Sequence, residues 1–172
     1  MEITLIGLCG KAGSGKDFIG NILCDKYGFK RFAFADPLKD HCRKEHGWDG
    51  KKDNKGRKLL QEEGTEKHRS INPNVWLDRL THEIELAFGD GHRKFVITDT
   101  RFPNELYYTK ELGISARITG RGGLDSKNSQ HSSENALDNE SFCYEINNSK
   151  DVSMEELLIQ IEEMIGIATN EY

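Results

Sequence analysis

The chain has 172 residues, which is enough for one domain whose core needs no disulfides. It is 35% hydrophobic and 31% charged, and it has no apolar run near the ~20 residues that span a bilayer. Its net charge of -5 argues against non-specific nucleic-acid binding, although a local cationic pocket remains open. We therefore expect a cytoplasmic protein (host cytoplasm if a phage encodes it) with free thiols, no stable nucleic-acid complex and no membrane partner.

The N-terminal third begins with a strand followed by a helix. Residues 3–8 are apolar and β-branched, as in a buried strand. A glycine-rich turn follows, and the helical spacing of Ile19, Ile22, Leu23 and Tyr27 then predicts a helix that stops at Gly28.

The middle of the chain predicts several further elements. Residues 32–35 suggest a second strand, and Asp36 suggests the N-cap of a helix that ends before Gly47. The charged residues 49–57 suggest a loop, with helices near 57–63 and 73–88. His41, Cys42 and His46 could form a metal site, but their spacing fits no standard zinc pattern, so we favour polar helix residues.

The remaining elements alternate between strand and helix. We expect strands at 95–98, 114–118 and 142–146, and a helix at 105–112. Residues 120–139 suggest a mobile loop, and Ser153-x-x-Glu156 is a possible capping box before a final amphipathic helix. This alternation predicts an α/β fold with a largely parallel sheet and helices on both faces, within a single domain.

The turn after the first strand fits the phosphate-loop pattern G-x-x-x-x-G-K. Its residues are Gly10, Lys11, Ala12, Gly13, Ser14, Gly15 and Lys16, followed by Asp17. Glycines let successive backbone N–H groups surround an anion, the following helix adds its positive end, and Lys16 can reach the outer phosphates. The bare pattern is weak in a chain with 17 glycines, but its place between a strand and a helix favours phosphate binding over a plain turn.

Two aspartates are candidates for organising Mg²⁺. Asp17 stands where a serine or threonine usually ligates the metal, so it could bind the metal itself or through water, or could simply favour the helix start. Asp99 follows the strand at 95–98, where a phosphate-loop enzyme places a second carboxylate, although it could also cap the next turn.

Arginines supply candidate phosphate clamps. Arg101 and Arg69 could each hold a phosphate with a planar guanidinium, or could be ordinary surface residues. Arg117 and Arg121 flank the start of the loop at 120–139, and arginines from a closing loop could neutralise a transferring phosphoryl group. His131 lies in the same loop and could touch substrate, although a lone loop histidine is more often solvated.

Together these segments resemble the phage-type deoxynucleoside monophosphate kinases. The resemblance covers nearly the whole chain and is carried by the phosphate loop with Asp17, Phe34-Ala35-Asp36-Pro37-Leu38-Lys39, Leu60-Gln61-x-x-Gly64-Thr65-Glu66-x-x-Arg69, Asn74-x-Trp76, Asp99-Thr100-Arg101-Phe102-Pro103-Asn104-Glu105, His131-x-Ser133-Glu134 and Asn147-Asn148-Ser149. Phe18 departs from it, since some members have a threonine there, and the chain lacks the insertions of larger members.

The resemblance implies a P-loop nucleoside monophosphate kinase fold, with an acceptor-binding part at about 36–76 and a lid at about 119–140. It implies transfer of a phosphate from ATP, with Mg²⁺, to a deoxynucleoside monophosphate for DNA precursor synthesis, and it leaves a homodimer open. Lys16 would serve ATP, and Arg121 would belong to the lid. The acceptor side would be lined by Asp36, Lys39, Arg69, Arg101 and Glu105, with Trp76 and His131 as further substrate contacts.

Two alternatives remain at this point. A kinase of another small phosphorylated acceptor would share the phosphate loop and differ in its acceptor pocket. A non-enzymatic nucleotide-binding module would bind ATP without turnover. A GTPase-type switch would carry an N-K-x-D motif, which the sequence lacks.

Overall fold

The computed structural model describes residues 3–51, 53–122 and 135–170. The chain divides into two compact units, one made of residues 1–31 and 92–172 and the other of residues 32–91. The expected acceptor part at 36–76 falls inside the second unit, and much of the expected lid, together with His131, lies outside the described residues.

The first unit is built on a sheet whose strands run in the order β2-β3-β1-β4-β5. The central strand β1 pairs in parallel with β3 and β4, and β4 pairs in parallel with β5. The strands are β1 (Thr4–Cys9), β2 (Lys30–Phe32), β3 (Lys94–Ile97), β4 (Ile114–Thr119) and β5 (Tyr144–Asn147). The predicted α/β fold with a parallel sheet flanked by helices is confirmed.

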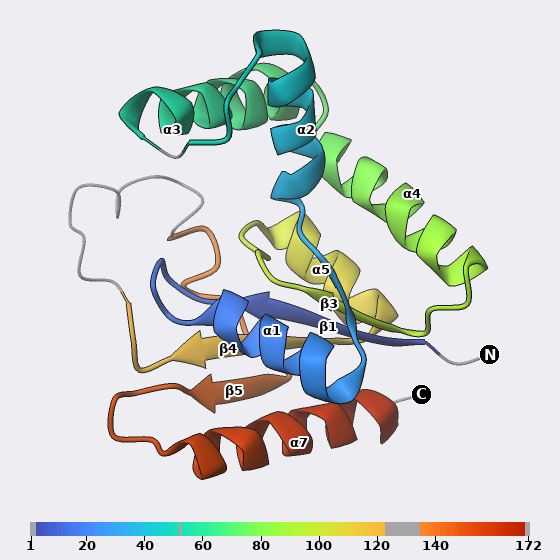
Figure 1. Ribbon diagram of the computed structural model, residues 1–172, viewed down its shortest axis with the longest axis vertical. Helices are drawn as coiled ribbons and strands as arrows, with labels where there is room; N and C mark the ends of the chain where they lie inside the picture. The colour runs from blue at the N-terminus through green and yellow to red at the C-terminus, as the bar shows by residue number, and fades with distance from the viewer. Residues whose placement is uncertain (1–2, 52, 123–134, 171–172) are drawn as a thin grey trace. The chain divides into compact units, whose positions relative to one another are not determined.

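Helices cover both faces of this sheet (Figure 1). Helices α1 (Lys16–Tyr27) and α7 (Met154–Asn170) share one apolar cluster with Ile6 and Leu8 of β1. Helix α5 (Pro103–Leu112) packs on the opposite face, where Gly7 lies so close that a Cβ would meet Thr109 Cγ2 at 2.4 Å. Successive residues of a strand point to opposite faces, so the alternation along β1 places a helix on each side.

Two predicted helix ends are confirmed in detail. Gly28 closes α1 with φ 74°, the left-handed conformation that glycine adopts without a Cβ penalty. Before α7, the Glu156 backbone N–H donates to Ser153 Oγ at 3.2 Å, and the Ser153 N–H donates to Glu156 Oε2 at 2.8 Å. These bonds form the predicted capping box, and the backbone donor of Ser153 lowers the pKa of Glu156.

The second unit is helical. It contains α2 (Ala35–His46), α3 (Asn54–Gln61), a π-helix η1 (Glu62–Arg69) and α4 (Val75–Gly89). Leu38, Cys42 and Trp76 form its buried apolar cluster. The Trp76 indole N–H donates to the Gly64 carbonyl of η1 at 3.0 Å, which ties α4 to the π-helix.

Three predictions in this unit are wrong in their boundaries. The strand expected at 32–35 ends at Phe32, and α2 begins at Ala35 with Phe34 as its N-cap, so Asp36 lies in the first turn and does not cap it. The run at 32–34 is buried and apolar, and such a run fits either element. Residues 54–57, expected as loop, begin α3 because Asp53 Oδ1 accepts from the Gly56 N–H at 2.8 Å.

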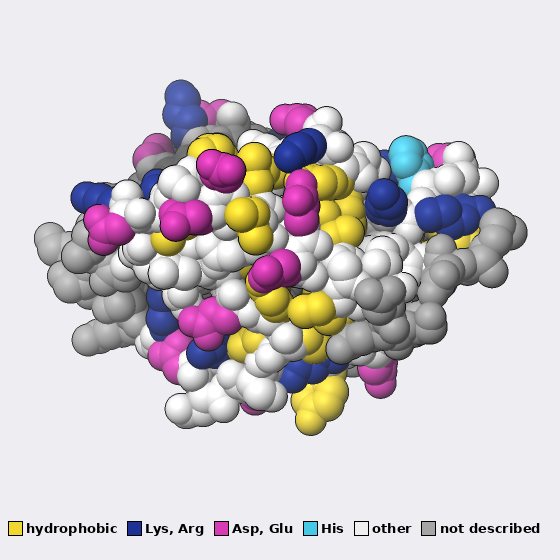
Figure 2. Space-filling view, turned by 90° about the horizontal axis from the view of Figure 1, so that it is seen from below, with side chains coloured by type: hydrophobic (Ala, Val, Ile, Leu, Met, Phe, Trp, Pro, Cys, Tyr) yellow, Lys and Arg dark blue, Asp and Glu magenta, His cyan; other side chains and the backbone are white. Residues whose placement is uncertain are grey.

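The surface around α7 mixes acidic and hydrophobic side chains. Figure 2 shows acidic groups spread between hydrophobic ones on this face, in keeping with the net charge of -5. Met154 and Ile159 of α7 are about half exposed, at 53% and 50%. Among the described residues, no helix combines the length and apolar character needed to cross a membrane.

Candidate active site at the phosphate loop

The loop between β1 and α1 has the backbone shape that its glycines predict. Gly10, Gly13 and Gly15 have φ of 155°, 77° and 98°, values that other residues rarely adopt. Gly15 is the N-cap of α1 and has no side chain to satisfy the first N–H groups of the helix. The start of α1 therefore presents backbone donors and the positive end of its dipole to an anion.

A side chain from the other end of the unit holds this loop. The Asn148 amide, buried just after β5, donates to the Ser14 carbonyl at 2.8 Å. A Cβ on Gly15 would lie 2.3 Å from the Asn148 amide nitrogen. Ser14 Oγ is buried and has no hydrogen-bond partner among the described residues. A buried polar atom of this kind is costly unless a ligand or water satisfies it, so the loop fits a polar ligand such as a phosphate.

Both lysines of the loop contact nearby oxygens. The Lys16 ammonium donates to the carbonyls of Gly10 and Lys11, at 2.6 and 3.0 Å. The Lys11 ammonium forms an ion pair with Asp138 at 2.5 Å and donates to Asn135 Oδ1 at 3.1 Å. Lys16 is partly buried, and a bound phosphate could replace the two carbonyls as its acceptor.

A cavity of about 310 Å³ lies beside the loop. Three arginines line it, namely Arg101, Arg117 and Arg121, together with Cys9, Gly10 and Lys11 at the end of β1. Three arginines and Lys11 at one cavity, beside the acidic Asp138, are consistent with the local cationic pocket that the net charge of the chain did not exclude. Arg101 and Arg121 were predicted site residues, and the structure brings them to the same cavity.

From the sequence, Arg117 was, with Arg121, a candidate for neutralising a transferring phosphoryl group, but it was not among the predicted site residues. It lies on β4, where its guanidinium donates to the carbonyls of Leu137 and Glu140, at 2.5 and 3.2 Å. It also lies over the Phe142 ring, 4.4 Å from the ring centre. Arg117 lies near the carboxyl end of a strand that pairs with β1, and ligands of parallel α/β sheets bind at the carboxyl ends of the strands, so its position could have pointed to this site.

The Cys9 side chain also lines the cavity, but its environment favours the neutral thiol. Burial raises the pKa of Cys9, and this outweighs the nearby cations Arg117 and Lys16, which act in the opposite direction. Because the thiolate is the reactive form of cysteine, Cys9 is better suited to packing than to nucleophilic chemistry.

The two candidate metal-organising carboxylates lie on neighbouring elements. Asp17 is exposed in the first turn of α1, and Asp99 lies two residues after the end of β3. Gly20 of α1 lies against Thr98, where a Cβ would meet Thr98 Cγ2 at 2.6 Å, so the end of β3 runs beside the first turns of α1. Thr98 and Thr100, on either side of Asp99, have buried hydroxyls without a partner among the described residues. Oxygen ligands are those that Mg²⁺ prefers, so the side chains at the end of β3 and the start of α1 have suitable chemistry, and the metal role of Asp17 and Asp99 stays a prediction.

Glu105 holds the backbone that carries Arg101. Its buried carboxylate accepts from the backbone N–H groups of Arg101 and Phe102, at 2.7 and 3.1 Å. These contacts fix the turn between β3 and α5. The role on the acceptor side that the resemblance implies for Glu105 stays a prediction.

The other predicted acceptor residues belong to the second unit. Asp36 and Lys39 form an ion pair at 2.6 Å on the first turn of α2, and Arg69 is the half-buried last residue of η1. Trp76 is 1% exposed in the apolar cluster, which favours a role in core packing over contact with a substrate. The substrate roles of these residues stay predictions.

Comparison with known proteins connects this geometry to a family. The chain is 32% identical to the "Putative deoxynucleotide monophosphate kinase" of Acanthamoeba polyphaga mimivirus, and the match covers 92% of this chain and 94% of the mimivirus protein. The chain belongs to the deoxynucleotide monophosphate kinase family. Membership at this coverage supports a kinase that acts on a nucleotide or another small molecule.

Two further comparisons give a second viral relative and a solved structure with the same fold. This chain is also 31% identical to the "Uncharacterized protein ORF76" of Ictalurid herpesvirus 1. The match covers 84% of this chain and 60% of the herpesvirus protein. The crystal structure of TT1252 from Thermus thermophilus matches this structure with a TM-score of 0.56 at 14% sequence identity. The match covers 96% of this chain and 98% of the TT1252 chain, so the two proteins share the fold. No family model matches the sequence.

Proposed function

We propose that this protein transfers the γ-phosphate of ATP to a deoxynucleoside monophosphate, giving ADP and a deoxynucleoside diphosphate. The observation that carries the proposal is a phosphate loop adjoining a cavity lined by three arginines. A phosphoryl donor and a phosphorylated acceptor both bring negative charge, and this part of the molecule offers the groups to receive it. Family membership supports the choice of acceptor.

Each residue of the proposed site would contribute position or charge. The loop amides and Lys16 would bind the β- and γ-phosphates of ATP, with Lys16 exchanging its contacts to Gly10 and Lys11 for phosphate oxygens. Arg101 would hold the acceptor phosphate in line with the γ-phosphate, on the backbone that Glu105 fixes. Arg121 would complete the set of cations at this cavity.

Mg²⁺ would supply charge neutralisation on the phosphates when bound. Asp17 and Asp99 would hold it, directly or through water. Asp17 would also favour the start of α1, because a carboxylate in the first turn complements the helix dipole. The arginines of the cavity, together with Mg²⁺ held by this carboxylate pair, would balance the charge of two phosphorylated substrates.

The test is a coupled ADP-release assay with ATP, Mg²⁺ and each common deoxynucleoside monophosphate, beside a control without acceptor. We expect at least one monophosphate to stimulate ADP release strongly. Lys16→Ala should lower acceptor-dependent turnover about 1,000-fold, because it removes a charge positioned for the transferring group, while the circular dichroism spectrum stays unchanged. Lys26→Ala, in the last turn of the same helix, removes an exposed pair with Glu162 and should leave turnover intact.

The other outcomes separate the alternatives. Near-normal turnover in folded Lys16→Ala would contradict the role of the loop. ADP release that responds to another phosphorylated acceptor, but to no deoxynucleoside monophosphate, would overturn the proposed substrate and leave a small-molecule kinase. ATP binding with no release under any acceptor would indicate a non-enzymatic nucleotide-binding module.

A further inference from the structure

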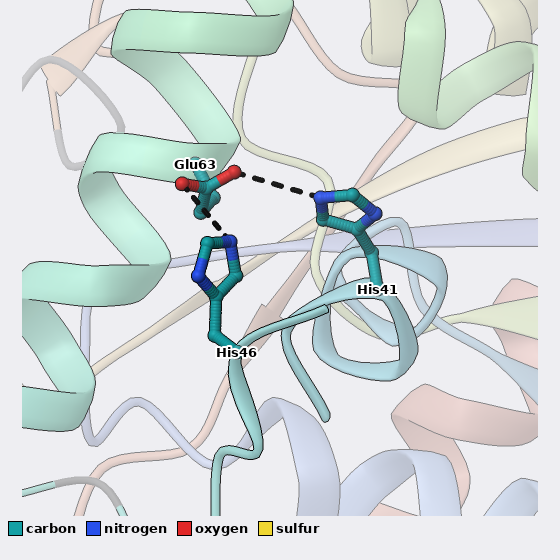
Figure 3. Close-up of side chains that lie close together, drawn as sticks. All are labelled: His41, His46 and Glu63. Atoms are coloured by element: carbon teal, nitrogen blue, oxygen red, sulfur yellow. Dashed lines mark ion pairs between the residues drawn. The ribbon is translucent and has the colours of Figure 1, made fainter. Parts of the chain in front are cut away.

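Four metal-ligating side chains converge in the second unit. His41 and His46 come from α2, and Glu63 and His68 come from the π-helix η1. Figure 3 shows His41 and His46 directed at the two carboxylate oxygens of Glu63. The ligand atoms of His41, His46 and Glu63 all lie within 4.8 Å of one another.

Three of the ligand atoms form a nearly regular triangle. The Nε2 atoms of His41 and His68 are 3.2 Å apart, and each lies 3.5 Å from Glu63 Oε2. A tetrahedral Zn²⁺ with ligand bonds of about 2.0–2.1 Å separates its ligand atoms by about 3.3 Å. The three atoms therefore already have the spacing of one face of a zinc tetrahedron.

His46 is placed to supply the fourth ligand. Its Nε2 lies 3.2 Å from Glu63 Oε1, the other oxygen of the same carboxylate. His46 is the last residue of α2, and its side chain is 35% exposed, so a rotation of the imidazole can bring it to the open corner. A closed set of four protein ligands is typical of structural zinc sites.

The π-helix explains how Glu63 and His68 meet. Their separation of five residues places them on different sides of an α-helix, where neighbours on one face are three or four residues apart. A π-helix closes its hydrogen bonds over five residues and so brings positions i and i+5 together. Such segments are uncommon and frequently occur at functional sites, so η1 is a candidate for a functional segment.

The surroundings suit a bound cation. The Glu63 side chain is 4% exposed, and its carboxylate meets the Lys67 ammonium at 2.5 Å as well as the histidines. Lys67 is 61% exposed and can leave toward solvent when a metal takes its place. The buried ring of Trp76 lies against His68 and His41, with ring centres 5.3 and 6.1 Å apart, and so restricts how these imidazoles turn.

We propose that His41, His46, Glu63 and His68 form a zinc site that fastens α2 to the π-helix. Three imidazoles and one carboxylate favour Zn²⁺ over Mg²⁺, which prefers oxygen ligands in an octahedral arrangement. Cys42, which the sequence had grouped with His41 and His46, is fully buried in the apolar cluster instead. The site is independent of the proposed kinase activity, and either proposal can fail while the other stands.

The test is metal binding to the whole chain after treatment with a chelator. Titration with Zn²⁺ by calorimetry should give one equivalent per chain, and Co²⁺ should give the intense visible absorption of a tetrahedral complex. His68→Gln should weaken Zn²⁺ binding at least about tenfold, because it removes one corner of the triangle. His82→Gln is the matched control, since His82 is 71% exposed on α4 with Glu85 at 3.9 Å as its acidic neighbour.

A stability readout keeps the proposal testable if a variant folds poorly. The same concentration of Zn²⁺ should raise the melting temperature of the wild-type chain and of His82→Gln, because a ligand that binds the folded state stabilises it, and should raise that of His68→Gln by less. The proposal is overturned if zinc binds with equal affinity to His68→Gln and His82→Gln. A weak, octahedral Co²⁺ spectrum with the wild-type chain would also overturn it.

Discussion

The phosphate loop of the first unit and the histidine–glutamate cluster of the second are made from different parts of the chain. The loop is a backbone structure, in which Gly10, Gly13 and Gly15 give the peptide its shape and one amide, from Asn148, anchors it. The cluster is a side-chain structure, in which two helices bring imidazoles to one buried carboxylate. We infer that substitutions in the loop should lower the stability of the fold by straining the backbone. Substitutions around the cluster should lower it by loss of packing and of hydrogen-bond partners.

The largest expected effect follows from Gly15→Ala. Its φ of 98° disfavours any Cβ, and that Cβ would also lie 2.3 Å from the Asn148 amide nitrogen, so the amide would lose its bond to Ser14. We expect a loss of about 3 kcal/mol in the free energy of unfolding, measured by urea denaturation. Gly28→Ala is the control, because its φ is 74° but the space around it is open, and it should cost about 1 kcal/mol. Equal losses would show that the contact with Asn148 contributes nothing.

A smaller effect is expected from Trp76→Phe in the second unit. The indole N–H groups of Trp76 and Trp48 each donate to a carbonyl at 3.0 Å, to Gly64 and Lys51 respectively. Trp76 is 1% exposed, so its replacement leaves both a void and a buried carbonyl without its donor, and should cost about 2 kcal/mol. Trp48→Phe should cost less than about 1 kcal/mol, because solvent can reach Trp48 and its acceptor. If thermal unfolding shows that Trp76→Phe and Trp48→Phe lose similar amounts of stability, the burial of Trp76 is not what stabilises this unit.

The smallest effect is expected at the capping box before α7, a side-chain feature made of neighbours in the sequence. Ser153→Ala removes the hydroxyl that accepts from the Glu156 N–H and should cost about 1 kcal/mol in urea denaturation. Ser141→Ala, at an exposed serine in the segment before β5, should change the free energy of unfolding by less than about 0.5 kcal/mol. A loss at Ser141 as large as that at Ser153 would remove the cap as the explanation.

The same variant has a consequence for titration. The pKa of Glu156 is lowered by the backbone N–H of Ser153 and then by its hydroxyl. The carboxylate therefore stabilises the fold above the ordinary glutamate pKa, and this contribution is lost as the pH falls through the lowered value. In Ser153→Ala the pKa of Glu156, measured by NMR titration, should move up toward its ordinary value, and an unchanged pKa would leave the backbone donor as the whole cause.

Features made of neighbouring residues were predictable from the sequence. The phosphate loop, the stop at Gly28 and the box at Ser153 each depend on a few consecutive positions, and the structure has them where they were expected. The parallel sheet was predictable because buried strands alternate with amphipathic helices. The start of α2 was not, because the apolar run before it suits a strand end and a helix cap equally well.

Features made by contacts between distant residues were not predictable. His41 and Glu63 lie 22 positions apart, and their meeting depends on how α2 packs against the π-helix. The π-helix has no sequence pattern comparable to the spacing of an amphipathic α-helix, and residues 57–63 suggested only an ordinary helix. The strand that carries Arg117 was predicted, but the neighbour of that strand was not, and the pairing of β4 with β1 is what brings Arg117 to the cavity.

The hydrogen bond from Asn148 to Ser14 has a consequence for when the phosphate loop can fold during synthesis. The phosphate loop lies within the first 16 residues, yet its anchor is residue 148, and the strands on either side of β1 begin only at residues 94 and 114. During synthesis the loop therefore leaves the ribosome long before the segments that fix its shape, and closing such long-range contacts is a late step in folding. A nascent chain therefore has the loop sequence before the loop has its folded shape. We expect the loop to bind a nucleotide only when the first unit is nearly complete.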